Sequence, residues 1–167
     1  MRGESCTTMT STQPTQLTTD YLIVGAGAFG LGFLEELILN SDNLEAVIVD
    51  KRDKPGGHWN DAYSFVRLHQ PASTYGVNSR SLGVGGPDLA SKSAILAHYE
   101  SALTDLLATG RVTFLSQCEY LGQGKIVSLL DENIQYQVTT VTAWLPQSLS
   151  PSPSDLNMMF RSSIGES

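Results

Sequence analysis

The spacing of apolar and polar residues predicts a strand, a helix and a second strand within residues 21–49. Residues 21–24 form a short apolar run of the kind found in buried strands. From about residue 29 to residue 40, apolar side chains recur every three or four positions, which predicts an amphipathic helix that ends in turn residues. Residues 46–49 form a second apolar run, rich in β-branched side chains. A strand, a helix and a strand in about 30 residues are typical of a βαβ unit with parallel strands.

Beyond this unit the pattern predicts a long loop, one more helix and further strands. In residues 51–88 the apolar side chains follow neither helical nor strand spacing, and Gly, Ser, Asn and Pro are frequent. The aromatic and histidine side chains of this segment favour an ordered, functional loop. Helical spacing returns from Leu89 to Thr109, and Gly110 is well placed to end that helix. Three strands are predicted after it, the last two joined by a hairpin turn, at residues 111–115, 125–130 and 134–141.

Glycine is concentrated at the junction between the first predicted strand and the first helix. Gly25, Gly27 and Gly30 form a G-x-G-x-x-G motif there. In this setting the first glycine permits a tight turn, the second lets the backbone approach a pyrophosphate, and the third lets the helix pack closely on the strand. The N-terminus of the helix then offers unpaired N–H groups and a partial positive charge to the phosphates. The motif therefore predicts a dinucleotide-binding turn.

An acidic residue supports this interpretation and bears on the choice of nucleotide. Asp50 ends the second predicted strand, 20 residues after Gly30, where an acid accepts hydrogen bonds from a ribose hydroxyl. Because a carboxylate repels a 2′-phosphate, this position disfavours NADP. NAD and FAD both remain, since the spacing does not separate them. The alternative is that these are ordinary turn glycines and a strand-end aspartate. The combination of strand, motif, helix and acid favours the dinucleotide-binding turn over it.

The sequence after Asp50 resembles FAD-dependent oxidoreductases of the flavin-containing monooxygenase type. In those proteins a G-G-x-W motif follows the acid, and here it is Gly56, Gly57, His58 and Trp59. The stretch "VRLHQPASTYGVNSR" is similar to a group of FAD/NAD(P)-binding, monooxygenase-like proteins. The resemblance covers about residues 20–140 and favours FAD over NAD. It implies an α/β fold, in which a Rossmann-like FAD-binding βαβ unit with a parallel sheet carries a small antiparallel β-meander.

The resemblance also implies a set of cofactor-binding residues, although it assigns no catalytic residue. The glycine turn would line the pyrophosphate, the strand-end acid and its neighbour would hold the adenosine ribose, and the G-G-x-W motif would lie along the FAD. Residues 67–69 of the long loop (Arg67, Leu68 and His69) would approach the flavin, and the strand after the second helix would run beside the adenine. The residues are Gly25, Ala26, Gly27, Ala28, Phe29, Gly30, Asp50, Lys51, Gly57, His58, Trp59, Arg67, His69 and Cys118.

Several of these residues have ordinary structural alternatives. Trp59 is equally a core or anchoring aromatic side chain, and His69 is equally a hydrogen-bonded structural histidine. Arg67 would commonly be a surface charge, but its apolar sequence neighbours favour a half-buried side chain with an anionic partner. Cys118 fits a packed strand residue better than a redox thiol, because no C-x-x-C motif or activating base is near it in the sequence.

The sequence departs from the family in ways that suggest an incomplete domain. Members of the family are much longer, and they carry a second glycine motif for NADPH and a later Gly-Asp that this sequence lacks. We expect a disordered leader at residues 1–19, a partial FAD/NAD(P)-binding domain at residues 20–141 and a disordered, Pro- and Ser-rich tail at residues 142–167. A truncated gene model would account for this. An incomplete sheet would expose an apolar edge, which we expect a partner chain or an oligomer to cover.

Composition limits the partners. The net charge of −7 argues against nucleic acid and against an anionic membrane surface, and no run reaches the roughly 20 apolar residues of a membrane span. Cys6 and Cys118 give neither a disulfide framework nor a metal-binding spacing, and the three histidines are dispersed. A cytoplasmic location and no metal are the expectations.

The leading functional hypothesis is the FAD-binding portion of a flavin-dependent, monooxygenase-like oxidoreductase. The resemblance implies oxygenation of a small-molecule substrate, with NADPH as a co-substrate. One alternative is another oxidoreductase with the same fingerprint, such as an NAD-linked dehydrogenase or a different flavoprotein. A second alternative is a non-catalytic nucleotide-binding module or a truncated, inactive fragment, which the missing second glycine motif supports.

Overall fold

The computed structural model of the protein describes residues 13–83 and 87–145. In chain order the elements of these residues are β1 (Thr15–Val24), α1 (Ala28–Leu39), β2 (Ala46–Val49), the 3₁₀ turns η1 (Gly57–Asn60) and η2 (Ala72–Thr74), α2 (Lys92–Ala108), β3 (Val112–Leu115), β4 (Cys118–Gly122), β5 (Lys125–Ser128) and β6 (Gln135–Leu145).

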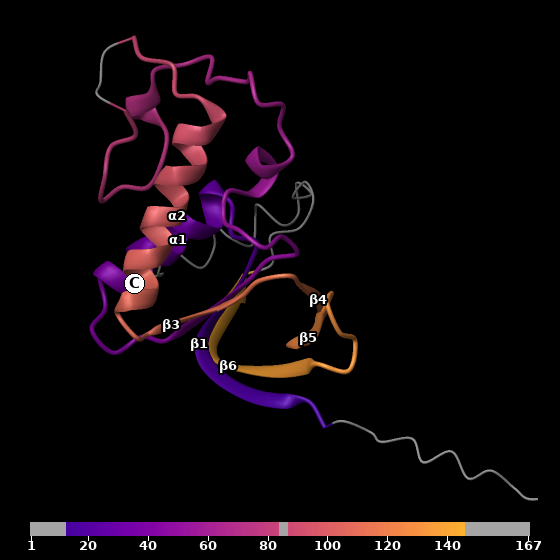
Figure 1. The fold of residues 1–167 in the computed structure, drawn as a ribbon. Helices are drawn as coiled ribbons and strands as arrows, with labels where there is room; N and C mark the ends of the chain where they lie inside the picture. The colour runs from indigo at the N-terminus through magenta and orange to yellow at the C-terminus, as the bar shows by residue number, and fades with distance from the viewer. Residues whose placement is uncertain (1–12, 84–86, 146–167) are drawn as a thin grey trace, which may run out of the picture.

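The strands form one mixed sheet in the order β3-β2-β1-β6-β5-β4 (Figure 1). Neighbouring strands from β3 to β6 in this order are parallel, whereas β5 is antiparallel to both β6 and β4. The predicted α/β fold, with its βαβ unit, parallel sheet and antiparallel meander, is therefore confirmed. The meander is continuous with the parallel sheet, because β6 pairs with β5 near its start and with β1 over most of its length.

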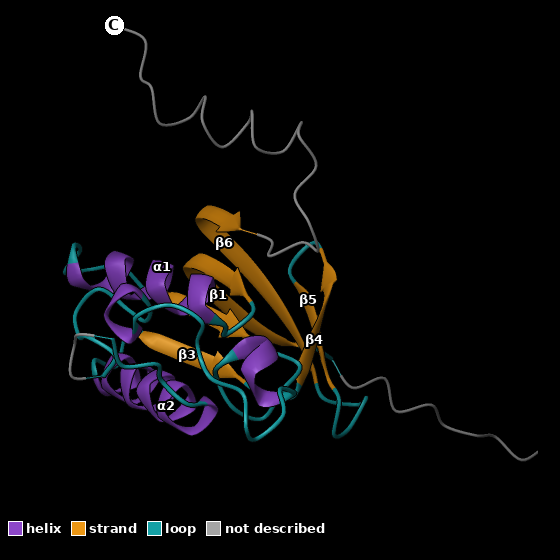
Figure 2. Cartoon of the chain, turned by 90° about the horizontal axis from the view of Figure 1, so that it is seen from above, coloured by secondary structure: helices purple, strands orange, loops and turns teal. Residues whose placement is uncertain are grey.

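Successive residues of the central strands pack on opposite faces of the sheet. Ile23 and Ile48 belong to a core shared with α1 and α2, whereas Leu22 and Val47 belong to a second core shared with the meander. Figure 2 shows the two helices at one end of the molecule and β4 and β5 at the other. This arrangement places apolar side chains on both faces of β2 and of the C-terminal part of β1, which explains why residues 21–24 and 46–49 form continuous apolar runs.

Two predicted boundaries are wrong because β1 and β6 pair with each other. β1 begins at Thr15, so residues 15–19 belong to the sheet and not to a disordered leader. β6 continues to Leu145, beyond the predicted limit of residue 141. Parallel pairing over both segments satisfies backbone groups that neither segment could satisfy alone. The predictions for residues 1–12 and 146–167 lie outside the described residues.

Two further expectations concern the later elements. Gly110 has a φ of 73°, and its N–H donates to the Leu107 carbonyl, so the predicted helix stop is confirmed. The predicted strand ranges did not include β4, although Cys118 was expected to be a strand residue; β4 follows β3 after two residues and pairs with β5. The side of β1 that faces away from β2 is covered by β6, so this strand of the described sheet has no bare edge.

The long loop is ordered where the structure describes it, and part of it ties the two helices together. We call residues 76–81 the strap. The backbone N–H and the hydroxyl of Ser79 both donate to the buried carboxylate of Glu35 on α1, at 3.0 and 2.6 Å. On the α2 side, the Val77 N–H donates to Nε2 of the buried His98 at 3.1 Å, and Arg80 pairs with Asp105. The strap therefore holds α1 and α2 through polar contacts.

We expect the stability of the protein to fall below about pH 6.5 because of His98. Burial, together with the nearby Arg80, lowers the pKa of His98 from its ordinary value of 6.5, and Glu35 opposes this shift. The unfolded chain therefore takes up this proton at a higher pH than the folded chain. The contribution of His98 to stability is complete above 6.5 and is lost as the pH falls through the lower, folded pKa.

Urea unfolding at about pH 7.5 and about pH 5.5 measures this effect. The His98→Gln variant should lose part of the pH dependence, whereas a His69→Gln variant, changed at an exposed position, should keep all of it. Equal pH dependence in the wild type and in His98→Gln would contradict the expectation.

Candidate dinucleotide site

A cavity of about 780 Å³ lies at the carboxyl ends of β1 and β2, the position at which open α/β sheets bind ligands. Its walls come from the glycine turn, the start of α1, the end of β2, the G-G-x-W loop and β4. The lining residues are Val24, Gly25, Gly27, Ala28, Phe29, Val49, Asp50, Lys51, Arg52, Gly57, His58, Cys118 and Tyr120.

The glycine turn has the geometry that its sequence predicts. Gly25 has a φ of 102°, a conformation that side chains rarely adopt. A Cβ on Gly30 would lie 2.0 Å from the Gly25 carbonyl oxygen, so only glycine permits α1 to approach the turn this closely. Gly27 is the N-cap of α1, in an extended conformation with a φ of −88°. A Cβ at Gly27 would meet only Gly57, at 3.5 Å.

The first turn of α1 is open to the cavity. α1 begins at Ala28 without a side-chain cap and without an acidic residue in its first turn. The N–H groups of Ala28 and Phe29 therefore have no partner inside the helix, and both residues line the cavity. Free N–H groups and the positive end of the helix dipole favour a negatively charged group at this position.

Asp50 is buried, with 6% of its surface exposed, and both of its carboxylate oxygens accept backbone hydrogen bonds. The Ala26 N–H donates to Oδ2 at 2.7 Å, and the Arg52 N–H donates to Oδ1 at 2.8 Å. The Arg52 guanidinium lies 3.9 Å from Oδ1. Asp50 thus lines the cavity and also supports the glycine turn.

The Gly56-Gly57 loop packs backbone against backbone on the glycine turn. The Gly56 N–H donates to the Ala26 carbonyl at 2.7 Å. Both loop glycines have positive φ, 117° and 54°, and a Cβ on Gly57 would lie 3.1 Å from the Gly27 Cα. The two glycine motifs of the sequence therefore meet and form adjoining parts of one wall, which their separation along the chain does not reveal.

Two cations line the cavity next to Asp50, and each pairs with an acid on another segment. Lys51 pairs with Glu119 of β4 at 2.8 Å. Arg52 pairs with Asp61, and this hydrogen bond raises the pKa of Arg52 and lowers the pKa of Asp61. The sequence prediction did not include Arg52, although its place two residues after the strand-end acid was a usable signal. It also did not include Tyr120, which lies on the unpredicted β4.

Five of the predicted site residues do not line this cavity. Ala26 and Gly30 act through the turn itself. Trp59 is buried in the helix-side core, where its indole N–H donates to the Tyr75 hydroxyl at 2.8 Å. His69 is exposed. Arg67 is exposed too, so the expected half-burial of its side chain is wrong, and its guanidinium donates to the Leu89 carbonyl.

The remaining predicted residues line the cavity, and Cys118 does so from a packed position. Its side chain is 4% exposed and belongs to the meander-side core, and burial raises the pKa of the thiol. A raised pKa reduces the thiolate fraction and hence the reactivity of the side chain. Cys118 is thus a packed strand residue, as the sequence favoured.

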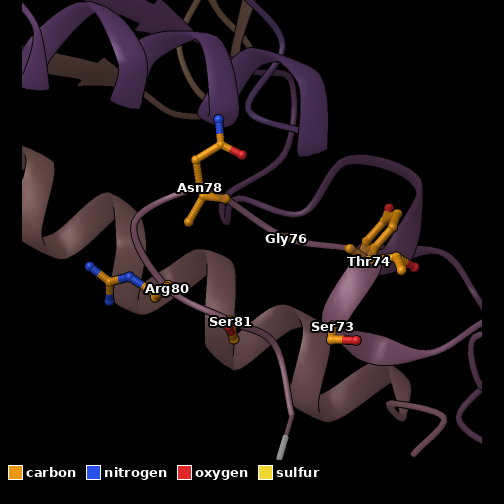
Figure 3. Close-up of a pocket in the computed structure, with 8 residues that line it drawn as sticks. Ser73, Thr74, Gly76, Asn78, Arg80 and Ser81 are labelled. Atoms are coloured by element: carbon orange, nitrogen blue, oxygen red, sulfur yellow. The ribbon is translucent and has the colours of Figure 1, made fainter. Parts of the chain in front are cut away.

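A second hollow, of about 180 Å³, lies along residues 73–81 (Figure 3). Its polar side chains do not converge. Figure 3 shows Asn78 directed toward α1, where its amide donates to Glu36, and Arg80 directed toward α2, where it pairs with Asp105. We assign no ligand to this hollow.

No helix among the described residues is long and apolar enough to cross a membrane. The same residues contain no cluster of three or more His, Cys, Asp or Glu side chains that could hold a metal ion.

Residues 23–79, which include the glycine turn and the Gly56-Gly57 loop, match the family model of an NAD(P)-binding Rossmann-like domain. An uncharacterized protein of Mycobacterium tuberculosis is 43% identical over 143 residues, covering 76% of this chain and 26% of that protein. A protein of Mycobacterium bovis gives the same values. This chain thus spans about a quarter of the length of the curated relatives it matches.

Two solved enzyme structures share the fold. A flavin-containing monooxygenase from Stenotrophomonas maltophilia aligns with a TM-score of 0.55 at 20% identity, covering 73% of this chain and 36% of that chain. A bacillithiol disulfide reductase from Staphylococcus aureus aligns with a TM-score of 0.55 at 12% identity, covering 76% and 39%. The predicted resemblance to FAD/NAD(P)-binding oxidoreductases is confirmed by the family model and the fold. At these identities the likeness is one of fold, and a monooxygenase and a disulfide reductase share it.

Proposed function

We propose that this chain binds a dinucleotide in the cavity at the carboxyl ends of β1 and β2 and that the dinucleotide is FAD. The observation that carries the proposal is the glycine turn, which presents the uncapped N-terminus of α1 to the cavity. A pyrophosphate needs such N–H donors, a positive local field and close backbone approach. The match to a dinucleotide-binding family model over residues 23–79 supports the same conclusion.

The residues present fit the cofactor. At about 780 Å³ the cavity is within the range of cofactor pockets, roughly 300–1,000 Å³. Side chains at Gly27 and Gly57 would fill space where the two glycine motifs meet at the cavity wall, and glycine at both positions leaves that space open. His58, Cys118 and Tyr120 extend the wall beyond the turn and provide contact surface for the rest of a nucleotide. The fold is shared with a flavin-containing monooxygenase, and this similarity favours FAD over NAD.

We further propose that the chain corresponds to the FAD-binding portion of a monooxygenase-like oxidoreductase that uses NADPH and oxygenates a small molecule. A bound flavin supplies the redox chemistry, while the protein binds and orients it and excludes water. The resemblance of residues 50–83 and the fold shared with a flavin-containing monooxygenase support this proposal. None of the cavity residues is assigned a catalytic role.

A second candidate is a nucleotide-binding module without turnover. One observation favours it: the sequence contains a single G-x-G-x-x-G motif. This candidate shares the cavity and the bound nucleotide with the first. The two differ in whether NADPH reduces the bound cofactor.

The visible absorption spectrum of the purified, desalted chain, before and after incubation with FAD, is the test. We expect a flavin band that survives desalting and that excess ADP displaces, because ADP carries the pyrophosphate and the adenosine. Bleaching of the band by NADPH would favour the oxidoreductase, and an unchanged band would favour the module. A colourless protein that takes up neither FAD nor ADP would overturn the proposal.

A further inference from the structure

Asp50 has a backbone partner on each carboxylate oxygen, as described above. Its own backbone is also fully engaged, because its N–H donates to the Leu115 carbonyl and its carbonyl accepts from the Cys118 N–H. These contacts join the end of β2 to the glycine turn, to β3 and to β4. Contacts within the protein therefore hold the Asp50 side chain in place without any contribution from a bound ribose.

The Ala26 peptide group is the centre of this arrangement. Ala26 is completely buried, so its N–H can reach no water and needs a protein acceptor. Asp50 accepts from that N–H, and the Ala26 carbonyl accepts from the Gly56 N–H at 2.7 Å. A continuous path of hydrogen bonds thus runs from Asp50 through Ala26 to Gly56, and it fixes both glycine motifs of the wall relative to each other.

We propose that Asp50 contributes to nucleotide binding chiefly as a positioning residue: it orients the Ala26 peptide, and through it the glycine turn and the Gly56-Gly57 loop. The inference rests on the proposed function, because it assigns a role within the same dinucleotide site. It differs from the usual expectation for a strand-end acid, in which the carboxylate acts through the ribose hydroxyls.

The relative sizes of the two effects favour positioning. A buried N–H that loses its acceptor costs the full desolvation penalty of that group, and charge-assisted bonds such as that from Ala26 to Asp50 are the strong ones. A ribose hydroxyl that loses an acceptor at the wall of an open cavity can bond to water instead. The Ala26 contact is also made whether or not the ligand carries hydroxyl groups.

Four dissociation constants separate the two roles. Wild type and Asp50→Asn are each titrated with ADP and with 2′,3′-dideoxy-ADP by isothermal calorimetry. Asparagine keeps the shape of aspartate, but it loses the negative charge that strengthens the bond from the Ala26 N–H, and it places an amide N–H₂ against one of the two backbone N–H groups. We expect the variant to bind both nucleotides about tenfold more weakly or worse, by the same factor for each. Asp53→Asn, at an exposed position of the same loop, should bind like the wild type.

The other outcomes are equally definite. If Asp50→Asn weakens ADP but leaves dideoxy-ADP unchanged, the residue acts through the ribose and the inference is wrong. If wild type binds neither nucleotide, the proposed function itself fails. Amide hydrogen exchange of the protein alone then still tests the positioning role. We expect faster exchange at Ala26 and Gly56 in Asp50→Asn and not in Asp53→Asn, and unchanged exchange at both amides would overturn the inference.

Discussion

Replacing Gly30 by alanine is expected to lower the free energy of unfolding by about 3 kcal/mol or more. The added Cβ would lie 2.0 Å from the Gly25 carbonyl oxygen and 3.2 Å from its carbonyl carbon. Both are backbone atoms of a turn that Asp50 and β2 already hold, so relief requires moving α1 away from β1. A loss of this size is a large part of the roughly 5–15 kcal/mol that stabilises a domain. Urea unfolding followed by circular dichroism measures it.

Gly32 provides the matched control on the same helix. It lies two residues further along α1, and a Cβ there would meet no atom within 4 Å. Gly32→Ala should raise the stability by about 0.5–1 kcal/mol, because alanine is the better helix former. Similar effects of the two substitutions would show that the close contact between Gly30 and the turn does not contribute to stability.

Replacing Gly27 by valine is expected to remove FAD and ADP binding while leaving the fold intact. The φ of −88° and ψ of −171° are accessible to valine, so the backbone is not strained. The valine methyl groups would occupy the space at the N-terminus of α1 where Gly27 and Gly57 both line the cavity. We expect affinity for ADP to fall about a hundredfold or more, since the phosphates could no longer approach the backbone.

The smaller substitution Gly27→Ala tests whether the loss of affinity increases with the size of the side chain. Its Cβ would lie at an ordinary contact distance of 3.5 Å from the Gly57 Cα, so it should fold normally and bind with intermediate affinity. Thermal unfolding of all three proteins shows whether the fold is kept, and the flavin absorbance shows binding. Full FAD content in Gly27→Val would remove the glycine turn from the binding site.

These two substitutions separate two uses of glycine within one motif. At Gly30 the absence of a side chain serves the packing of α1 on the turn, and at Gly27 it serves access to the cavity. The roles could be anticipated from the motif. Its spacing did not reveal that Gly27 also faces Gly57, because 30 residues separate them in the chain.

The parts of the fold that the sequence predicted are those that depend on neighbours in the chain. β2 has the predicted bounds, α1 begins one residue before its predicted start, and Gly110 ends α2 as expected. Each follows from side-chain periodicity or from the backbone freedom of glycine. The errors at β1 and β6 arose where strand formation depends on a partner more than a hundred residues away. The omission of β4 likewise concerns a strand stabilised by pairing, here with β5.

The sequence by itself determined the βαβ unit, the glycine turn and the acid at the end of β2, because short-range periodicity and backbone sterics specify them. Tertiary structure decided which residues share the cavity. It brought Arg52 and Tyr120 to the wall, left Arg67 and His69 exposed, and placed Trp59 in the core. It also gave Asp50 its backbone partners. The physical reason is that hydrogen-bond partners and burial depend on how distant segments pack, whereas turn geometry depends on the residues of the turn.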